Sequence, residues 1–238
     1  MQDLIHGAAR LGITLTPAQM DSFETYFKEL TDWNTRVNLT AIVEYKDVQI
    51  KHFLDSLTVA LALPKPLPSG YKLIDVGSGG GFPGLPLKIV FPQIHLVLLE
   101  ATNKKAAFLR HMIEVLKLDD ASVTSSRAEE AAQQPEYREQ FDAAVTRGLA
   151  GMAVLTELTL PFCKIGGRLI AQKKGDIAEE LSTAGKAIRV LGGAPAQVRP
   201  IELPEFTDNR CLVIVEKIAA TPPQFPRRPG MPAKKPLG

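Results

Sequence analysis

The stretch LIDVGSGGGFPG, residues 73–84, is the part of the sequence best suited to chemistry. One carboxylate, Asp75, lies among three apolar residues, and five glycines follow. Glycines let the backbone turn sharply and approach a ligand closely, so we expect a ligand-binding turn here. The spacing of Gly79, Gly81 and Gly84 also matches GxGxxG, which alone is a weak indication of a dinucleotide site.

Asp75 discriminates between the cofactors that such a turn could bind. A dinucleotide turn wraps a pyrophosphate, and a carboxylate beside it would repel that group. The same carboxylate would attract S-adenosylmethionine, which carries an ammonium and a sulfonium and no phosphate. We therefore predict S-adenosylmethionine rather than NAD. The alternative is that Asp75 only caps the turn through backbone amides.

Three further positions could complete a cofactor site. Glu100 ends the apolar run IHLVLLE and is suited to accept ribose hydroxyls. The segment SSRAEE, residues 125–130, is expected to contact the adenine, although acids at a helix start give the same pattern. Arg147 could contact a base, a phosphate or the cofactor carboxylate, or it could pair with a nearby acid on the surface.

The elements that must position these residues alternate along the chain after residue 66. Short apolar runs predict strands at residues 72–76, 95–99, 122–124, 141–146 and 168–172. Helices are expected near residues 83–90, 103–118, 128–133, 152–162 and 178–191. This alternation indicates a parallel sheet covered on both faces. Two last runs, 196–203 and 211–218, predict an antiparallel hairpin at one edge of a seven-stranded, mostly parallel sheet.

The chain is expected to have three parts. Residues 1–66 are predicted to form a helical appendage, in which Thr16 and Gln19 have the spacing of a helix cap. A helix over about 45–63 is stopped by LPKPLPSG, because proline cannot continue a helix interior. Residues 67–220 form the sheet domain, and residues 221–238 form a basic, proline-rich tail.

The tail carries four cations and no acid: Arg227, Arg228, Lys234 and Lys235. Its prolines are expected to prevent helix formation and keep it extended. Such a segment either reaches for phosphates or packs along the body as a strap. The net charge of +2 for the whole chain does not by itself demand a nucleic acid.

Composition points to a cytoplasmic protein with no membrane partner. The apolar runs are far shorter than the roughly 20 residues that span a bilayer, and the N-terminus lacks the order of a signal peptide. Cys163 and Cys211 lie far apart and are interpreted as reduced core residues. No spacing typical of metal ligands is present, so no metal is expected. His52 and His111 are expected to be structural or exposed.

The motifs, taken in order, resemble those of the small-subunit ribosomal RNA guanine-N7 methyltransferases, the RsmG or GidB family. The resemblance covers nearly the whole chain. It is carried by WNTRVNLTAI, KHFLDSL, the glycine turn with its Phe-Pro-Gly, LLEATNKKAAFL, SRAEE, VTRGLA, AQKKG and FPRRPGMPAKKPL. It implies a class I, Rossmann-like methyltransferase fold with S-adenosylmethionine as cofactor. The implied target is a guanine in the 530 loop of 16S rRNA, free or in the small ribosomal subunit.

The resemblance also implies roles for individual residues. Cofactor contacts fall by position on Gly77, Phe82, Ala128, Glu129 and Arg147, with Glu100, Ala101 and Thr102 around the ribose. Asp75 and Gly79 complete this cofactor set from the turn itself. Arg147 and Lys173 are candidates for holding the guanine, and the four tail cations are candidate RNA contacts. Ser78, Gly80 and Gly148 depart from the family pattern and affect only loop detail. We expect a monomer.

The chemistry expected of such an enzyme needs no catalytic base. Guanine N7 has an in-plane lone pair and no hydrogen, so catalysis would consist of positioning. N7 faces the deep groove of an A-form helix, so the target must lie in a loop or be splayed out. The alternatives are a methyltransferase acting on another RNA or on a small molecule, an NAD-dependent dehydrogenase, and a non-catalytic RNA-binding module.

Overall fold

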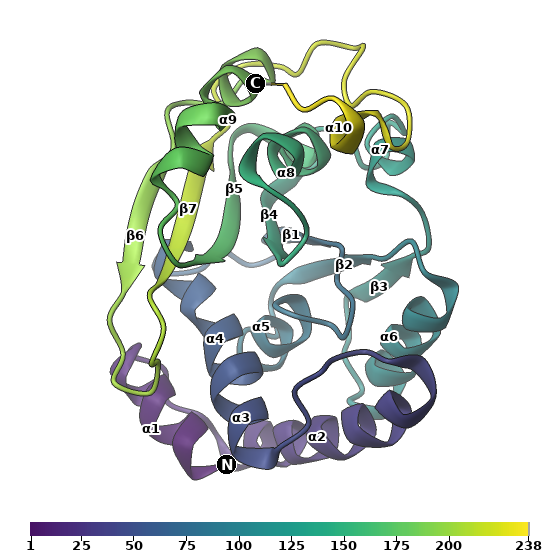
Figure 1. Ribbon diagram of the computed structural model, residues 1–238. Helices are drawn as coiled ribbons and strands as arrows, with labels where there is room; N and C mark the ends of the chain where they lie inside the picture. The colour runs from purple at the N-terminus through teal and green to yellow at the C-terminus, as the bar shows by residue number, and fades with distance from the viewer. Residues whose placement is uncertain (238) are drawn as a thin grey trace.

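A single seven-stranded sheet organises the computed structural model, which describes residues 1–237, in the order β3-β2-β1-β4-β5-β7-β6 (Figure 1). The strands are β1 (Lys72–Val76), β2 (His95–Leu99), β3 (Ala121–Thr124), β4 (Phe141–Arg147), β5 (Cys163–Lys174), β6 (Gln197–Ile201) and β7 (Arg210–Glu216). Strands β1 to β5 are parallel, whereas β7 runs antiparallel to both β5 and β6. The predicted fold class and its hairpin are confirmed. The strand order reverses between β1 and β4, where sheets of this kind bind ligands.

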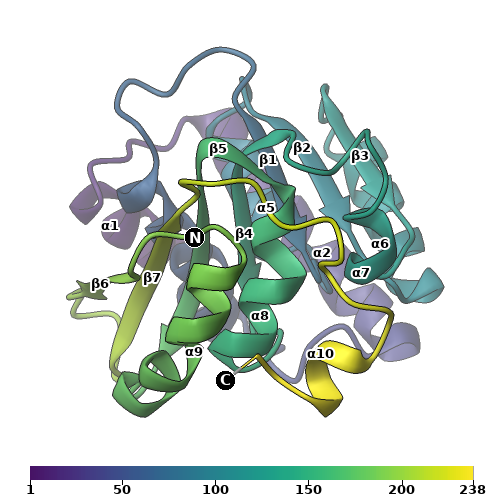
Figure 2. The same ribbon diagram turned by 90° about the horizontal axis from the view of Figure 1, so that it is seen from above.

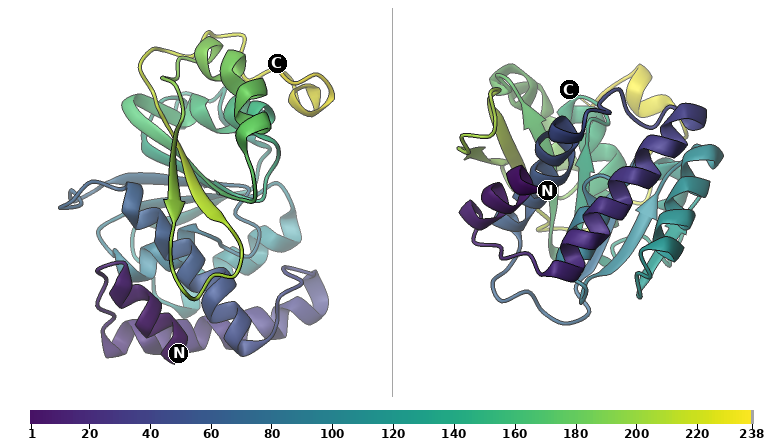
Figure 3. Two further views of the ribbon diagram at one scale, coloured as in Figure 1. Left: turned by 60° about the vertical axis from the view of Figure 1, so that its left-hand side comes forward. Right: turned by 90° about the horizontal axis from the view of Figure 1, so that it is seen from below.

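Helices cover both faces of the sheet. One layer holds α7 (Ala128–Ala131), α8 (Met152–Thr159), α9 (Ala178–Val190) and α10 (Met231–Lys234), which lie toward the viewer in Figure 2. The opposite layer holds α5 (Gly84–Val90), α6 (Asn103–Val115) and the N-terminal helices (Figure 3). A short 3-10 turn, Leu160–Phe162, leads from α8 into β5.

The N-terminal helices are α1 (Gln2–Arg10), α2 (Pro17–Val37) and a continuous helical stretch from Tyr45 to Ala62. That stretch passes through α3 (Tyr45–Val48), a π-helical turn (Gln49–Leu54), α4 (Asp55–Leu57) and a 3-10 turn (Thr58–Ala62). The cap predicted at the start of α2 is present in both directions between Thr16 and Gln19. The Gln19 side chain also donates to the carbonyls of Ile89 and Val90 and so docks α2 on the end of α5.

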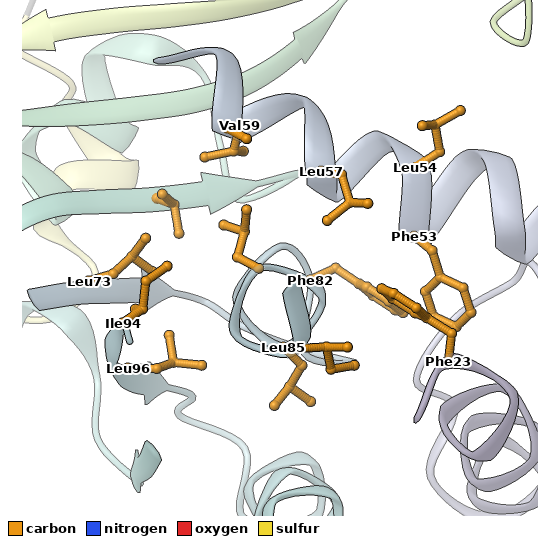
Figure 4. Packing of buried hydrophobic residues seen from close by; sticks show 14 of the residues in the cluster. Phe23, Phe53, Leu54, Leu57, Val59, Leu73, Phe82, Leu85, Ile94 and Leu96 are labelled. Carbon is orange, nitrogen blue, oxygen red and sulfur yellow. The ribbon is translucent and has the colours of Figure 1, made fainter. Parts of the chain in front are cut away.

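The hydrophobic core continues from the N-terminal helices into the sheet. Phe23 and Phe53 belong to the same buried cluster as Leu73, Leu85 and Leu96 from the sheet domain (Figure 4). A second cluster lies on the other face beneath α8 and α9. The expected boundaries near residues 66 and 220 fall in loops, but packing across the first is continuous. That the three parts act as separate domains stays a prediction.

Some expectations about elements need correction. The tail was expected to remain extended, but it contains a short helix, α10. The helix can form because Pro232 falls in its first turn, where proline is tolerated. β5 begins at Cys163, five residues earlier than predicted, with a shift in register against β4.

Cys163 and Cys211 are buried and free, as predicted. Residue 238 of the predicted tail lies outside the described residues. Within residues 1–237, no helix is long and apolar enough to cross a membrane.

Candidate cofactor and substrate site

The glycine turn after β1 is held from below by Asp75. The Asp75 side chain is 0% exposed, and its Oδ2 accepts a hydrogen bond of 2.8 Å from the amide of Gly84. Gly84 is the first residue of α5, so this amide has no acceptor within the helix. A Cβ on Gly84 would lie 2.8 Å from the same oxygen, so a larger residue could not come this close. Direct contact between Asp75 and a cofactor was expected; the structure instead places the carboxyl beneath the turn, as a cap.

Burial also changes the acidity of Asp75. Loss of solvent raises the pKa of this carboxyl to about 7, while the Gly84 amide and the charge of Arg147 act in the opposite direction. Its second oxygen, Oδ1, is buried and has no hydrogen-bond partner within the described residues. The turn is therefore built over a carboxyl group that takes up a proton near neutral pH.

Glu100 joins the turn after β1 to the turn after β2. Its Oε2 accepts from the Gly79 amide at 2.9 Å, and its Oε1 accepts from the Thr102 amide at 2.7 Å. Gly77 and Gly79 have φ values of +74° and +56°, the left-handed region that favours glycine. The structure thus brings Gly77, Gly79, Glu100 and Thr102 together at one end of the parallel strands, with Ala101 next to them in the chain.

The Glu100 carboxylate limits which cofactor chemistry fits at these turns. It accepts from the amides of Gly79 and Thr102, which a phosphate group would otherwise use. A pyrophosphate would meet negative oxygens instead of free donors. A cofactor that carries a positive charge and no phosphate is compatible with the arrangement.

The segment after β3 contributes Ala128 and Glu129 at the start of α7. Glu129 is 9% exposed, and its Oε1 accepts from the amide of Gly230 at 2.9 Å. Ala128 packs against the hydrophobic cluster beneath α8. The Glu129 carboxylate is therefore bonded to the C-terminal segment of the chain.

Arg147, at the end of β4, is bound by the helical layer. Its Nη1 donates to the carbonyl of Lys51 at 2.9 Å and to Oδ2 of Asp55 at 3.1 Å. Its Nη2 lies 3.0 Å from Nδ1 of His52. The alternative that Arg147 pairs with a nearby acid is confirmed, although the pair is largely buried rather than on the open surface.

Phe82 connects Arg147 with the glycine turn. The guanidinium of Arg147 lies 4.8 Å above the Phe82 ring, which stacks on His52 at 4.4 Å and on Tyr26 at 5.4 Å. The hydroxyl of Tyr26 donates to the carbonyl of Gly80 in the turn. Figure 4 shows Phe82 directed toward Phe53 and Phe23. The side chain of Phe82 therefore supports the turn from the helical layer, and the expected contact of this residue with the cofactor stays a prediction.

The π-helical turn supplies residues whose roles at the site the sequence did not reveal. It places His52 and the Lys51 carbonyl on Arg147, and Asp55 follows directly. Burial, with the charges of Arg147 and Arg210, lowers the pKa of His52 to about 3. His52 was expected to be structural or exposed, and the structure shows it buried. Asp55 lies in the motif KHFLDSL, which was the only available signal for it.

A cavity of about 770 Å³ lies beside Arg147, at the ends of β4 and β5. The π-helical turn and the loop between β6 and β7 form part of its lining. Five cations and three carboxylates line it: Lys51, Arg147, Lys173, Lys174, Arg210, Asp55, Glu180 and Asp208. The other lining residues are Ile42, His52, Gly148, Gln172 and Thr207.

Most charges in this cavity already have partners. Asp55 bonds Arg147 through one oxygen and Arg210 through the other, at 2.6 Å for the second pair. Lys173 donates to the carbonyl of Ala150 at 2.8 Å and to Glu180 at 2.5 Å. Lys51 pairs with Asp47 at 2.9 Å. The cavity is therefore a polar chamber whose walls are fixed by ion pairs.

The tail packs on the body, and Arg227 is its main anchor. The backbone amide and Nε of Arg227 donate to Oε1 of Glu157 at 2.9 and 2.8 Å, and Nη2 donates to Oε2 at 2.6 Å. The Glu157 side chain is 0% exposed. Arg227 was expected to contact RNA, but a phosphate would have to displace this buried carboxylate. Arg228, Lys234 and Lys235 are exposed and form no ion pair within residues 1–237.

Comparison with known proteins places the chain in a family. The model of the family described as rRNA small subunit methyltransferase G, GidB, matches residues 19–207. The ribosomal RNA small subunit methyltransferase G of Dehalococcoides mccartyi strain BAV1 is 55% identical over 237 residues, covering 100% of both chains. The protein of the same name from Roseiflexus castenholzii is 45% identical over 237 residues, again covering 100% of both.

Solved structures show the same fold at low identity. An O-methyltransferase from Bacillus cereus in complex with SAH has a TM-score of 0.54 and 19% identity, covering 81% of this chain and 91% of that one. The precorrin-6y C5,15-methyltransferase of Geobacter metallireducens has a TM-score of 0.52 and 13% identity, covering 69% and 87%. The fold is thus that of Rossmann-like methyltransferases, and the chain belongs to the rRNA small subunit methyltransferase G family, GidB.

Proposed function

We propose that this protein transfers a methyl group from S-adenosylmethionine to N7 of a guanine in the 530 loop of 16S rRNA. Membership of the family and the names of its relatives support an rRNA methyltransferase. The guanine N7 and the 530 loop rest on the resemblance of the sequence motifs to the guanine-N7 enzymes. The observation that carries the proposal is the position of Arg147, which lines the large cavity and also lies over Phe82 of the glycine turn.

The cofactor is proposed to lie along the joined turns after β1 and β2. Gly77 and Gly79 would let its methionine part approach the backbone, and Glu100, Ala101 and Thr102 would surround the ribose. Ala128 and Glu129 would flank the adenine from the segment after β3. Asp75 would contribute by holding the turn rather than by touching the cofactor, since it is sealed beneath Gly84. When bound, S-adenosylmethionine supplies a methyl group on a sulfonium.

The cavity is proposed to receive the target nucleotide. Its volume suits one splayed-out nucleotide, and its cations would meet the negative backbone around the base. Lys173 is the candidate donor for guanine O6, which would leave N7 free. Lys51, Lys174 and Arg210 would lie toward the phosphates. Arg228, Lys234 and Lys235 are proposed as additional RNA contacts outside the cavity.

Residues of this chain would act by position and charge. Guanine N7 carries no proton, so no side chain has to remove one. Arg147, fixed by Asp55, His52 and Lys51, would hold the boundary between the turn and the cavity in one geometry. His52 is held neutral by its environment, which suits support of Arg147 rather than proton transfer.

Two measurements test this assignment. Calorimetric titration should show binding of S-adenosylhomocysteine and none of NAD. Incubation with labelled S-adenosylmethionine should label 16S rRNA or small subunits from a strain that lacks the modification. Binding of NAD in preference to S-adenosylhomocysteine would reject the cofactor. Labelling of another RNA or of a small molecule alone would support the alternative methyltransferase.

A further inference from the structure

The C-terminal segment, residues 221–237, forms a strap over the connection between β3 and β4. Arg138 donates to the carbonyls of Thr221 and Phe225 at 2.8 Å each. Gln133 donates to the carbonyl of Pro226 at 2.9 Å. The Phe225 side chain belongs to the buried cluster that contains Ala131 and Ala132. The strap thus supplies both hydrogen bonds and apolar cover to residues 128–139.

A second anchor fixes the strap to α8. Arg227 donates hydrogen bonds to the buried Glu157 from its backbone amide and from its guanidinium. Its Nη2 also donates to the carbonyl of Lys235 at 2.8 Å. Helix α10 packs on α8 beyond this point, as the yellow segment beside α8 and α7 shows (Figures 1 and 2). A buried carboxylate is stable only with its partner, so the strap is held firmly at Arg227.

Between these anchors and the end of the strap lies Gly230, whose amide donates to Oε1 of Glu129 at 2.9 Å. Gly230 has a φ of +81°, a conformation that other residues adopt with strain. No atom lies within 4 Å of the place where a Cβ would be, so strain rather than lack of space restricts this position. Glu129 is one of the two residues proposed to flank the adenine.

We propose that the strap is a positioning element for the cofactor site: through Gly230 and Glu129 it holds the start of α7 in the conformation that binds S-adenosylmethionine. This inference rests on the proposed function. The strap contacts Glu129, whereas the glycine turn is held by Glu100 and Asp75. It therefore acts on the adenine end of the site, and its loss leaves the Gly79–Glu100 and Gly84–Asp75 contacts in place.

The coupling must work in both directions. If the strap raises affinity for the cofactor, then binding of the cofactor stabilises the strap by the same factor. A lost hydrogen bond to a carboxylate is expected to weaken cofactor binding about tenfold.

The test uses the full-length protein and variants of one glycine. Gly230→Pro removes the amide donor and the positive φ, whereas Gly230→Asn keeps the donor in a residue that tolerates this conformation. Gly12→Pro is the matched control, because Gly12 has a φ of +76°, no atom within 4 Å of its Cβ position, and a place after α1. Binding of S-adenosylhomocysteine is measured by calorimetry, and thermal unfolding is recorded for each protein.

The expected result is about tenfold weaker binding for Gly230→Pro, with Gly230→Asn and Gly12→Pro within about twofold of the unchanged protein. Binding by Gly230→Pro that matches the unchanged protein overturns the inference and leaves the proposed function intact. Failure of the unchanged protein to bind S-adenosylhomocysteine rejects the proposed function itself.

Hydrogen exchange on the unchanged protein needs no variant, and it tests the coupling between the strap and the cofactor site even if Gly230→Pro does not fold. Addition of S-adenosylhomocysteine should slow exchange in residues 126–133 and in residues 225–234 together. Slower exchange in residues 126–133 alone contradicts the coupling.

Discussion

Nη1 of Arg147 lies 3.1 Å from Oδ2 of Asp55, and this contact joins the end of β4 to the helix that covers the site. The two residues are 92 positions apart in the chain. Asp55 also holds Arg210 of β7, so one carboxylate orients two cations of the cavity wall. The geometry of the cavity therefore depends on a pair that neither motif reveals alone.

Replacement of Arg147 by lysine should show how much this geometry matters. Lysine keeps the charge but cannot bond Lys51, Asp55 and His52 at once while lying flat over Phe82. We expect Arg147→Lys to lower kcat for methyl transfer roughly tenfold to hundredfold in a folded protein. Arg189→Lys, on the exposed end of α9, is the matched control and should leave kcat unchanged. Equal kcat values for the two variants would show that the geometry of Arg147 does not contribute to methyl transfer.

The raised pKa of Asp75 predicts how the free energy of unfolding depends on pH. Its folded pKa of about 7 lies above the ordinary 3.8, so the folded state binds the proton more tightly between these values. This group therefore makes the free energy of unfolding fall as pH rises through that window. The lowered pKa of His52 has the opposite effect between about 3 and 6.5.

Comparison with Asp75→Asn isolates the Asp75 effect, because His52 contributes equally to both proteins. Asparagine can still accept from the Gly84 amide but cannot ionise. From pH 4 to pH 8 the variant should gain about 1–4 kcal/mol of stability relative to the unchanged protein, measured by urea unfolding. Parallel pH profiles would mean that Asp75 has an ordinary pKa.

Removal of the Asp75 side chain tests the turn rather than the charge. Asp75→Ala leaves the Gly84 amide buried without an acceptor, which loosens the turn that bears Gly77 and Gly79. We expect S-adenosylhomocysteine to bind more weakly by about 1–3 kcal/mol, measured by calorimetry in protein shown to be folded. Unchanged affinity would show that the cap does not matter for the cofactor.

The exposed tail cations and the anchor Arg227 should behave differently. If Arg228, Lys234 and Lys235 all meet phosphates, replacing them with alanine lowers the slope of log affinity against log salt by at most about 2.1, roughly 0.7 per contact on single-stranded RNA. Arg227→Ala instead leaves Glu157 buried without its partner, and should lower stability by about 3–5 kcal/mol. Binding to an rRNA fragment at several salt concentrations, with thermal unfolding alongside, separates the two. An unchanged slope in the triple variant rejects the RNA role.

The rate of methyl transfer should not require a deprotonated base. In single turnovers with saturating cofactor, we expect no steep rise between about pH 6 and 9. A log-linear slope near one across this range, which persists in Asp75→Asn, would identify a base among the residues of the cavity.

The sequence predicted the elements better than the contacts between them. Strand positions followed from apolar runs bounded by turns, and the Thr16–Gln19 cap from local spacing, because both depend on near neighbours. The direction of the Asp75 side chain depends on Gly84 and on the helix that begins there. The partners of Arg147 come from a helix far away in the chain, and those of Arg227 from the buried face of α8. Such contacts are set by tertiary packing, which a local pattern does not encode.

The central claim is tested most directly by finding the methylated atom. Small subunits or 16S rRNA that lack the modification are incubated with the protein and labelled S-adenosylmethionine, and the RNA is digested and mapped by mass spectrometry. The account predicts a single 7-methylguanosine within the 530 loop, formed roughly tenfold to hundredfold more slowly when Arg147→Lys replaces the unchanged protein. A label on another atom, another base or a position outside that loop would contradict it.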